Sequence, residues 1–573
     1  MVISSGTKEK IAGDSMINKE IAKIFYEISE ILKLKNVQWK PQAYNKAARV
    51  IDDMEEDLKE IYDKKGLAGL DEIPGVGRGI AKKIEEYLKT GKIKEYQKLK
   101  KSVPKGLIEM MDITGIGPKR AQLLFKKLKI KSVKDLERAV KKHKIKKLER
   151  FGEKSERDIE EEIEFFKKRN KNRMILGDAL DLAEEVVKKL KAKRIMICGS
   201  IRRMYETIGD IDILAVGDKS IIDDFCKLAD RILAKGEGKA SIIIGDRQAD
   251  LRVVPKDDFW SGVHYFTGSK DHSVELRKIA IKKGMKLSEY GLFKNEEKIG
   301  GKSEEEIYQK LGMQYIPPEL RENRGEIEAA IKRKIPKLID YGDIKGDLHV
   351  HTKYSDGNNS ILEMVKAAKN LGYSYIGISD HSKTRKIAGG LSEDELMKEI
   401  KEVRRIKVSG IKVLIGSEVD ILGDGSLDYS DNVLKKLDYA IGSIHSGFKG
   451  DVTKRILKAM ENKYMNILAH PTGRLIQSRK GYELKFDEIL RLAKETKTLL
   501  EINAHSERLD LRDEMIKATI ENGNKLIIGT DAHNVDGLRH MRLGIGQARR
   551  GWARKEDVVN TLSLNEFKKE LRK

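Results

Sequence analysis

The chain has 573 residues, which is enough for about four domains at roughly 150 residues each. Its formal net charge of +23 favours polyanionic partners, nucleic acid before all. No apolar run is long enough to span a membrane, and no signal-peptide pattern is present. Two cysteines, Cys198 and Cys226, exclude a disulfide scaffold and a cysteine-cluster zinc site. We therefore expect a soluble, monomeric protein of the cytoplasm.

The first part of the chain is helical by pattern. Residues 1–16 are polar without periodicity and predict a disordered leader, whereas 17–96 repeat apolar residues at three- and four-residue spacing. Two segments resemble each other, "LDEIPGVGRGIAKKIEEYL" and "MMDITGIGPKRAQLLFKKL". Their aligned Gly-x-Gly turns contain Gly75, Gly77, Gly115 and Gly117.

A Gly-x-Gly turn that opens a helix leaves backbone N–H groups free to hold a phosphate. Both segments therefore resemble the helix-hairpin-helix motif, which binds a DNA backbone without reading its sequence. Residues 101–150, which include the second turn, contain 16 basic and 5 acidic side chains. Two helical hairpins with glycine caps and no DNA-binding role are the alternative.

A third feature is "CGSIRRMYETIGDIDILAV", in which Asp210 and Asp212 alternate with apolar residues. A period of two places both carboxylates on one face of a strand, where they repel unless a cation such as Mg²⁺ lies between them. A second strand candidate, "ASIIIGDRQADLRVV", contributes Asp250. Three aspartates that hold two metal ions about 4 Å apart suit phosphoryl transfer. The alternative is a turn with solvated aspartates.

In that arrangement Asp210 and Asp212 bridge the metal ions, and Asp250 helps to activate a 3′-hydroxyl. A triphosphate would be held by Gly199, Ser200 and Arg203. The motifs "GSIRR", "GDID", "ADLRVVP" and "YFTGS", preceded by two hairpin motifs, resemble the family X DNA polymerases of the DNA polymerase beta type.

The resemblance implies further roles for single residues. Tyr265, Phe266 and Gly268 would form a pocket that distinguishes deoxyribose from ribose, Gly209 would join the nucleotide site, and Arg277 would contact the template side. Ser273 stands where relatives often have an asparagine that contacts the nascent base pair, so fidelity does not follow from the resemblance. Lys83 falls on the position of a Schiff-base lysine that acts at abasic sites, although Lys82 lies next to it. The alternative is a solvated lysine.

The last part of the chain, from residue 344, contains eight of the eleven histidines. Seven apolar runs end in polar residues: "DLHVH", "YIGISDH", "VLIGSE", "YAIGSIH", "NILAH", "LLEINAH" and "LIIGTDAH". Strand-helix units that deliver side chains at strand ends predict a (β/α)7 barrel with its site at the C-terminal face. The candidate ligands are His349, His351, Asp356, His381, Glu418, His445, His470, Asp531 and His533. Nine such ligands imply a cluster of two or three Mn²⁺, Zn²⁺ or Fe²⁺ ions.

This set resembles the PHP (polymerase and histidinol phosphatase) domain ligand by ligand. Such a cluster activates water at neutral pH, so we expect hydrolysis of DNA. The two resemblances together imply gap filling in base excision repair at the nucleoid of a bacterium or archaeon, with 3′→5′ exonuclease activity and incision at abasic sites. Substrates would be gapped or primed DNA and deoxynucleoside triphosphates.

The predicted fold class is multidomain α+β. The expected parts are a leader (1–16), a lyase-like helical domain (17–96), fingers (97–164), a nucleotidyltransferase palm (165–260), a thumb (261–320), a linker (321–343) and the barrel (344–573). Two other functions stay open: a polymerase fused to a phosphatase of small esters, and a DNA-gap scaffold without catalysis.

Overall fold

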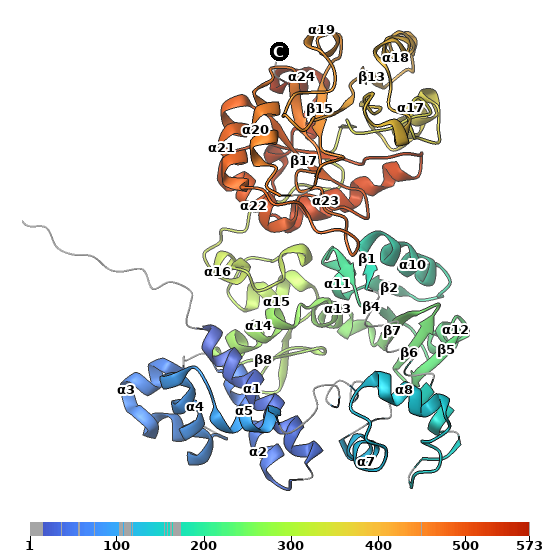
Figure 1. Ribbon diagram of the computed structural model, residues 1–573. Coiled ribbons are helices and arrows are strands. Elements are labelled where there is room, and N and C mark those ends of the chain that lie inside the picture. Colours follow the sequence, from blue (N-terminus) through green and yellow to red (C-terminus); the bar gives the residue numbers. More distant parts are fainter. Residues whose placement is uncertain are drawn as a thin grey trace, which may run out of the picture. The chain divides into compact units, whose positions relative to one another are not determined.

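Figure 1 shows a computed structural model of the chain. It describes residues 15–571 except 36, 55–57, 74, 102–106, 108–109, 111–115, 117, 150, 154, 158, 161–162, 164–172 and 449. The chain forms two compact units, Met1–Asn172 and Arg173–Lys573. Among the described residues, no helix is long and apolar enough to cross a membrane.

The first unit begins with five helices, as the periodicity predicted. They are α1 (Ser15–Leu34), α2 (Lys40–Asp53), α3 (Leu58–Asp71), α4 (Arg78–Thr90) and α5 (Lys94–Lys101). Ile21, Phe25 and Ile28 share one face of α1 and are fully buried in the core of these helices. Helix α1 begins at Ser15, inside the expected leader, and residues 1–14 lie outside the described part.

A second core in this unit surrounds α7 (Pro118–Leu128) and α8 (Val133–Lys141). The Ser132 hydroxyl caps α8 by accepting a hydrogen bond from the Asp135 backbone N–H at 3.2 Å. The glycines of the second predicted turn, Gly115 and Gly117, lie outside the described residues.

The second unit opens with a mixed five-stranded sheet in the order β2-β4-β7-β6-β5, in which β4 and β7 are parallel. Ile211, Ile213 and Ala215 of β4 belong to the core shared with helices α10 and α12, whereas Leu214 and Val216 belong to a cluster with Phe259 of α13. This alternation places Asp210 and Asp212 on the α13 face. The elements of this part are β1 (Met174–Ile175), α10 (Leu176–Lys188), β2 (Arg194–Ile197), α11 (Gly199–Arg202), β3 (Thr207–Ile208), β4 (Asp210–Val216), α12 (Ser220–Lys227), β5 (Arg231–Lys235), β6 (Lys239–Ile244) and β7 (Arg247–Val254).

A smaller α+β part follows, with the antiparallel sheet β10-β9-β8. Its elements are η2 (Lys256–Asp258), α13 (Phe259–Thr267), α14 (Lys270–Lys282), β8 (Lys286–Ser288), β9 (Gly291–Lys294), β10 (Glu297–Gly300), α15 (Glu304–Lys310), η3 (Pro318–Leu320) and α16 (Glu326–Ile331). Ile327, Ile335 and Leu338 are buried in the core of this part. Much of the segment 321–343, expected as a linker, therefore packs with the thumb, because its apolar residues cover α14 and α15 rather than facing solvent.

Each of the seven apolar runs predicted as strands in the last part forms a strand, and the run that ends at Glu418 is divided into β13 and β14. The strands are β11 (Gly346–Asp347), β12 (Tyr375–Ile378), β13 (Lys412–Ile415), β14 (Glu418–Asp420), β15 (Ala440–Ser443), β16 (Met465–Leu468), β17 (Leu499–Asn503) and β18 (Leu526–Gly529). The helices are α17 (Ile361–Asn370), η4 (Lys386–Ala388), α18 (Glu393–Arg405), α19 (Asp431–Leu434), α20 (Thr453–Glu461), α21 (Phe486–Thr496), α22 (Asp513–Glu521), η5 (Gly537–His540), α23 (Met541–Arg550), η6 (Lys555–Asp557), η7 (Val559–Thr561) and α24 (Leu564–Glu570).

All paired strands of this part are parallel and lie in sequence order, as a barrel requires. They form two sheets, β11-β12-β13 and β14-β15-β16-β17-β18. Single bridges join the sheets, from His381 to Glu418 and from Val350 to Ala532. The strand order agrees with the predicted barrel. Among the described residues, however, the hydrogen-bonded ladders do not run continuously around it, because only single bridges join the two sheets.

A buried ion-pair network joins the palm sheet to the thumb. The Glu304 carboxylate of α15 contacts the guanidinium groups of Arg202, at 2.5 Å, and Arg321, at 2.6 Å. Arg321 is fully buried and Glu304 is 3% exposed. The two arginines hold the pKa of Glu304 far below its usual range against the opposing effect of burial.

We expect Glu304→Ala to lower the free energy of unfolding by about 3–5 kcal/mol, because it leaves two buried or half-buried cations without their counter-ion. Urea denaturation followed by circular dichroism measures this change. Glu305→Ala, one residue along the same helix but exposed, is the matched control and should have little effect. Equal stability of the two variants would contradict the proposed importance of this network.

Candidate active sites

The three predicted aspartates converge on the palm sheet. Asp212 of β4 lies directly opposite Asp250 of β7 in the parallel register, and Asp210 precedes Asp212 by two residues on the same face. Burial, together with the charges of Asp210 and Asp250, raises the pKa of Asp212 to about 7. Three carboxylates at such close quarters form a site that a divalent cation would stabilise.

The Gly-Ser turn lies against this group. Gly199, at φ +60°, approaches so closely that an added Cβ would lie 2.0 Å from Oδ2 of Asp212. Only glycine fits this position, both for its backbone conformation and for this contact. The Cys198 N–H donates to the Asp212 carbonyl at 2.7 Å, which ties the start of α11 and therefore Ser200 to the aspartates.

Arg203 lies at the edge of the same region. Its Nη1 donates to the Thr267 carbonyl at 2.5 Å, and its Nε contacts Oε1 of Glu322 at 3.1 Å. Arg203 thus joins the Gly-Ser turn to the "YFTGS" turn, where an added Cβ on Gly268 would lie 3.2 Å from the Arg203 Nη1. A role of Arg203 at the triphosphate stays a prediction.

A cavity of about 210 Å³ opens beside the aspartates. Asp212, Asp250, Arg252 and Phe266 are among the residues that line it. The Arg252 guanidinium lies 5.2 Å from the centroid of the Phe266 ring, and the Tyr265 ring meets Phe266 edge to face at 5.1 Å. Sequence reasoning missed Arg252, although its place two residues after Asp250 on β7 is a signal that both share one face.

Other predicted nucleotide-site residues lie nearby in the chain but carry less geometric support. Arg277 of α14 is exposed, and its Nε donates to the Ser273 carbonyl at 3.2 Å. Gly209 lies just before β4, and an added Cβ there would lie 3.2 Å from Nη1 of Arg173. The contacts of these residues with a template or a nucleotide stay predictions.

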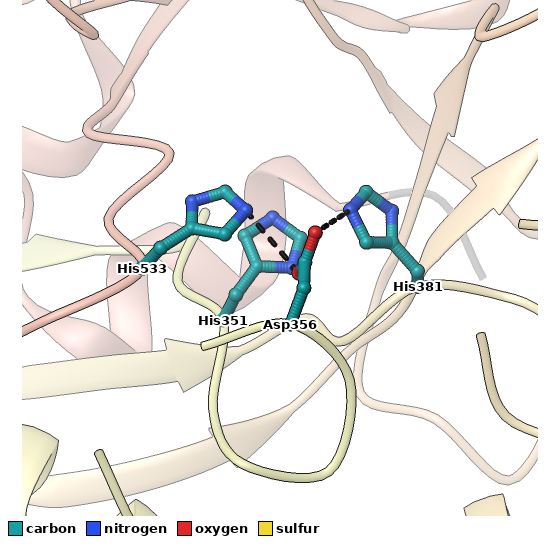
Figure 2. A group of neighbouring side chains, drawn as sticks. All are labelled: His351, Asp356, His381 and His533. Carbon is teal, nitrogen blue, oxygen red and sulfur yellow. Dashed lines mark ion pairs between the residues drawn. The ribbon is translucent and has the colours of Figure 1, made fainter. Parts of the chain in front are cut away.

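The nine predicted ligands of the last part come together in one cluster, buried around Glu418 and open to solvent at Asp356 and His533. Three groups in it have ligand atoms within 4.8 Å of one another. The first is His351, Asp356, His381 and His533, the second is His349, His351 and Asp531, and the third is His381, Glu418 and His445. Figure 2 shows the first group, in which the Asp356 carboxylate lies between His533, at 3.2 Å, and His381, at 3.6 Å.

The Glu418 carboxylate lies at the centre of the cluster. Its Oε2 is 2.9 Å from Nδ1 of His381, and its Oε1 is 2.9 Å from Nε2 of His470 and 3.2 Å from Nε2 of His445. Nε2 of His351 lies 3.5 Å from Glu418 and 3.3 Å from Asp531. Burial by itself would raise the pKa of Glu418. The surrounding imidazoles of His445, His381 and His349 outweigh this effect and hold the pKa well below its usual range.

This donor set fits metal ions. Imidazole nitrogens and carboxylate oxygens together suit Mn²⁺, Zn²⁺ or Fe²⁺. Several of these atoms are buried and make no well-aligned hydrogen bond, although some lie within ion-pair distance of one another, and a cation among them would satisfy them. They are Nε2 of His349, Nδ1 and Nε2 of His351, Nδ1 of His381, Oε2 of Glu418 and Nδ1 of His470.

Four family models match the chain. They are a helix-hairpin-helix domain at residues 16–93, a SAM-like helix-hairpin-helix tandem at 107–164, the DNA polymerase beta thumb at 262–322 and the PHP domain at 347–505. A protein of Bacillus subtilis (strain 168) named DNA polymerase/3′-5′ exonuclease PolX is 37% identical over 570 residues. The match covers 96% of this chain and 98% of that protein. The chain belongs to the family X DNA polymerases and carries a PHP domain.

Other relatives match the PHP part alone. A probable phosphatase of Caldicellulosiruptor bescii is 31% identical over 199 residues, which are 33% of this chain and 79% of that protein. A probable phosphatase of Clostridium novyi is 28% identical over 200 residues, with 33% and 78% covered. The family X assignment therefore rests on the full-length relative, and the phosphatases bear on the PHP domain only.

The PHP cluster has supporting residues that sequence reasoning did not identify. Glu501 accepts from Nδ1 of His349 at 2.6 Å and from the His470 N–H at 2.8 Å. Asp420 contacts Nδ1 of His445 at 2.5 Å. Such carboxylates fix the orientation of a ligating imidazole. Glu501 lies in the predicted strand "LLEINAH" and Asp420 lies two residues after Glu418, so the strand pattern was the available signal.

Arg508 is a cation beside the acidic side of the cluster. Its Nε lies 3.3 Å from Oδ2 of Asp531, and its side chain is 17% exposed. A guanidinium at the rim of a metal centre is suited to bind a phosphate oxygen. Sequence reasoning missed Arg508, because a lone arginine after a strand carries no distinctive pattern.

The candidate lyase residue of the first unit is Lys83 of α4. Its Nζ lies 2.5 Å from Oε2 of Glu95, and its side chain is 22% exposed, whereas the neighbouring Lys82 is exposed. Burial and the adjacent Glu95 raise the pKa of the Tyr44 phenol. Lys83 is therefore half-buried and ion-paired, whereas Lys82 is exposed. The Schiff-base role of Lys83 stays a prediction.

We expect the affinity of the palm aspartates for Mg²⁺ to rise about tenfold between pH 6 and pH 8. A raised carboxylate pKa means that the metal-free folded protein retains a proton on Asp212 below pH 7, and the cation must displace it. For the same reason, the metal-free fold is most stable below about pH 4 and loses stability as the pH rises through about 7, because the folded state keeps this proton and the unfolded chain does not. Isothermal titration calorimetry of a His349→Ala/His351→Ala variant, with and without Asp212→Ala, measures the palm site as the difference between the two titrations. An affinity independent of pH would contradict this account.

Proposed function

We propose that the chain is a DNA-directed DNA polymerase that fills short gaps and that also degrades DNA from the 3′ end with its PHP domain. The observation that carries the polymerase is the convergence of Asp210, Asp212 and Asp250 beside the Gly-Ser turn and the Phe266 cavity. Its substrates are primed or gapped DNA and deoxynucleoside triphosphates, and it acts as a monomer at the nucleoid.

In this proposal Asp210 and Asp212 hold Mg²⁺, which supplies charge neutralisation for phosphoryl transfer when bound. Asp250 orients the 3′-hydroxyl and accepts its proton. The backbone of the Gly199-Ser200 turn and Arg203 bind the triphosphate, and Phe266 with Tyr265 and Gly268 restricts the sugar. Gly209 and Arg277 complete the nucleotide site.

The PHP domain is proposed to hydrolyse phosphodiester bonds. Its nine ligands would hold Mn²⁺ or Zn²⁺, ions that lower the pKa of bound water and neutralise the phosphate. Arg508 is placed to bind a non-bridging phosphate oxygen, and Glu501 and Asp420 orient the imidazoles of His349 and His445. Incision at abasic sites would use the same group of residues.

Two further activities would link the chain to base excision repair. The turn with Gly75 and Gly77 would bind the DNA backbone, as would the second turn with Gly115 and Gly117. Lys83, as the free amine, would attack the aldehyde carbon of the ring-opened sugar at an abasic site and form a Schiff base with loss of water, and Glu95 would orient its Nζ. Both roles suit an enzyme that binds a gap and its 5′ end.

A phosphatase acting on small esters is the second candidate for the PHP domain. The relatives named probable phosphatases, which match this part alone, favour it. The two candidates differ in their product: a nuclease releases mononucleotides from a labelled DNA end, whereas a phosphatase releases inorganic phosphate from a small ester. Measurement of both products with one preparation decides between them.

We expect the two activities to be lost independently. Asp210→Ala or Asp212→Ala should abolish primer extension with Mg²⁺ and leave 3′→5′ degradation intact, because each site holds its own ions. His349→Ala/His351→Ala should abolish Mn²⁺-dependent degradation and leave extension intact. One gel with a labelled primer, run with and without nucleotides, records both. Loss of both activities in either variant, or degradation at the wild-type rate in the histidine variant, would contradict the two-site model.

We expect binding to short gaps with a downstream 5′-phosphate in preference to blunt duplex, and an affinity that falls at least tenfold between about 50 and 200 mM salt. Gly75→Ala should weaken binding about tenfold, because Gly75 has φ +87° and an added Cβ would lie 3.2 Å from Lys46. Gly79→Ala, with no atom within 4 Å of the added Cβ, is the matched control. Fluorescence anisotropy measures the preference for gaps, the salt dependence and the affinities of the two glycine variants. Affinity without salt dependence would argue against phosphate contacts by this turn.

A further inference from the structure

Helix α23 of the PHP domain holds three consecutive residues of the palm. Nη1 of Arg550 donates to the Arg203 carbonyl at 2.8 Å, and Nε2 of Gln547 donates to the Met204 carbonyl at 3.2 Å. The Arg550 guanidinium also lies 4.9 Å from the centroid of the Tyr205 ring. Figure 1 shows α23 at the edge of the PHP domain that faces α11. Helix α23 therefore contacts each residue of the palm turn 203–205.

This turn directly follows α11, the helix that carries the Gly-Ser residues. Met204 has φ +53°, a left-handed conformation that costs a residue with a side chain free energy and persists only when its surroundings impose it. The fit is close on the PHP side as well, since an added Cβ on Gly546 would lie 2.8 Å from Met204. The turn thus depends on α23 for its shape.

A shared carboxylate extends this contact to the Arg203 side chain. Oε1 of Glu322 accepts from Nη1 of Arg550 at 2.9 Å and from Nε of Arg203 at 3.1 Å. All three side chains are largely buried, with 2%, 12% and 13% exposed for Arg550, Glu322 and Arg203. Arg550 is fixed in turn by Asp513 of the PHP domain, at 2.8 Å. Buried, charge-assisted hydrogen bonds of this kind set geometry more strictly than exposed ion pairs do.

We propose that Arg550 of the PHP domain is a positioning residue for the nucleotide site of the polymerase. Through Glu322 and the backbone of the 203–205 turn it fixes the Arg203 guanidinium and the end of α11 relative to Asp212. The inference rests on the proposed polymerase function and on Arg203 as a triphosphate ligand. Its consequence is that the hydrolase domain forms part of the structural support for nucleotide binding.

The same helix provides a matched control. Arg542 of α23 also crosses to the palm, where its Nη1 contacts Glu184 at 2.6 Å and its Nη2 contacts Asp181 at 3.0 Å. These partners lie on α10, and neither contacts Arg203 or Glu322 among the described interactions. Arg542 is 35% exposed and Arg550 is 2% exposed, so the two variants are compared by the kind of effect. If α23 only holds the domains together, both should lower stability and neither should raise KM. If Arg550 positions the nucleotide site, the effects should differ.

The test is primer extension on gapped DNA with the full chain, in which kcat and KM for the nucleotide are separated. Arg550→Ala should raise KM about tenfold with kcat within about twofold, because a charge-assisted pair is lost without change at the aspartates. Arg542→Ala should leave both unchanged. Calorimetric binding of a deoxynucleoside triphosphate to the chain on a dideoxy-terminated primer should show the same tenfold loss without chemistry.

A second variant tests the path through Glu322. Glu322→Gln should raise KM to a similar degree, and Arg550→Ala/Glu322→Gln should raise it no further than either single change, because both act through one contact. Degradation of the primer without nucleotides should stay at the wild-type rate in each variant. Wild-type KM in Arg550→Ala, equal effects of Arg550→Ala and Arg542→Ala, or additive effects in the double variant would overturn the inference. A wild-type chain that does not extend a primer would instead overturn the proposed polymerase function.

Discussion

Both candidate sites depend on one physical interaction, the repulsion or incomplete hydrogen bonding of polar groups that the strands hold close together. At the palm site, half-buried Asp212 lies beside Asp210 and Asp250, and burial together with their charges raises its pKa. At the PHP site, six imidazoles surround Glu418 and two aspartates, and several of their nitrogen atoms make no well-aligned hydrogen bond. Neither cluster would be stable on packing alone, so both point to bound cations.

The two sites meet this constraint with different scaffolds. In the palm, a parallel pair of strands places two aspartates in register, and period two brings the third to the same face. In the PHP domain, successive parallel strands each end at the same edge, so single ligands from distant segments meet there. Hard carboxylate ligands suit Mg²⁺, and the mixed set suits a transition metal, which agrees with one synthetic and one hydrolytic reaction in the same chain.

The boundary between palm and PHP domain is polar and closely fitted rather than a flexible connection. Arg474 pairs with Glu206, Arg542 with Glu184, and Arg550 with Glu322, so arginines of the PHP domain repeatedly meet carboxylates of the palm and thumb. Leu509 and Leu543 of the PHP domain also belong to the apolar core of the palm. Replacement or removal of the PHP domain would therefore remove the contacts that α23 makes with the turn after α11.

The sequence by itself determined most of the elements and named the residues that the fold brings together. The seven apolar runs form strands, and Asp210, Asp212 and Asp250 share one face of the palm sheet as the spacing predicted. The fold also brings the nine candidate ligands together, eight of them after strands and Asp356 from the loop that follows β11. This was possible because helix and strand periods, and the placement of ligands at strand ends, are local properties of the chain.

Only the tertiary structure decided the rest. It assigned residues 321–338 to the thumb core, brought Glu501 to His349 and Arg508 to Asp531, and joined Arg550 to Arg203 across 347 positions of sequence. A single arginine or glutamate carries no periodic signal, because its partner is chosen by distance in space and not by spacing along the chain. The sequence therefore named the candidate groups for the chemistry, whereas the fold selected the groups that hold them in place.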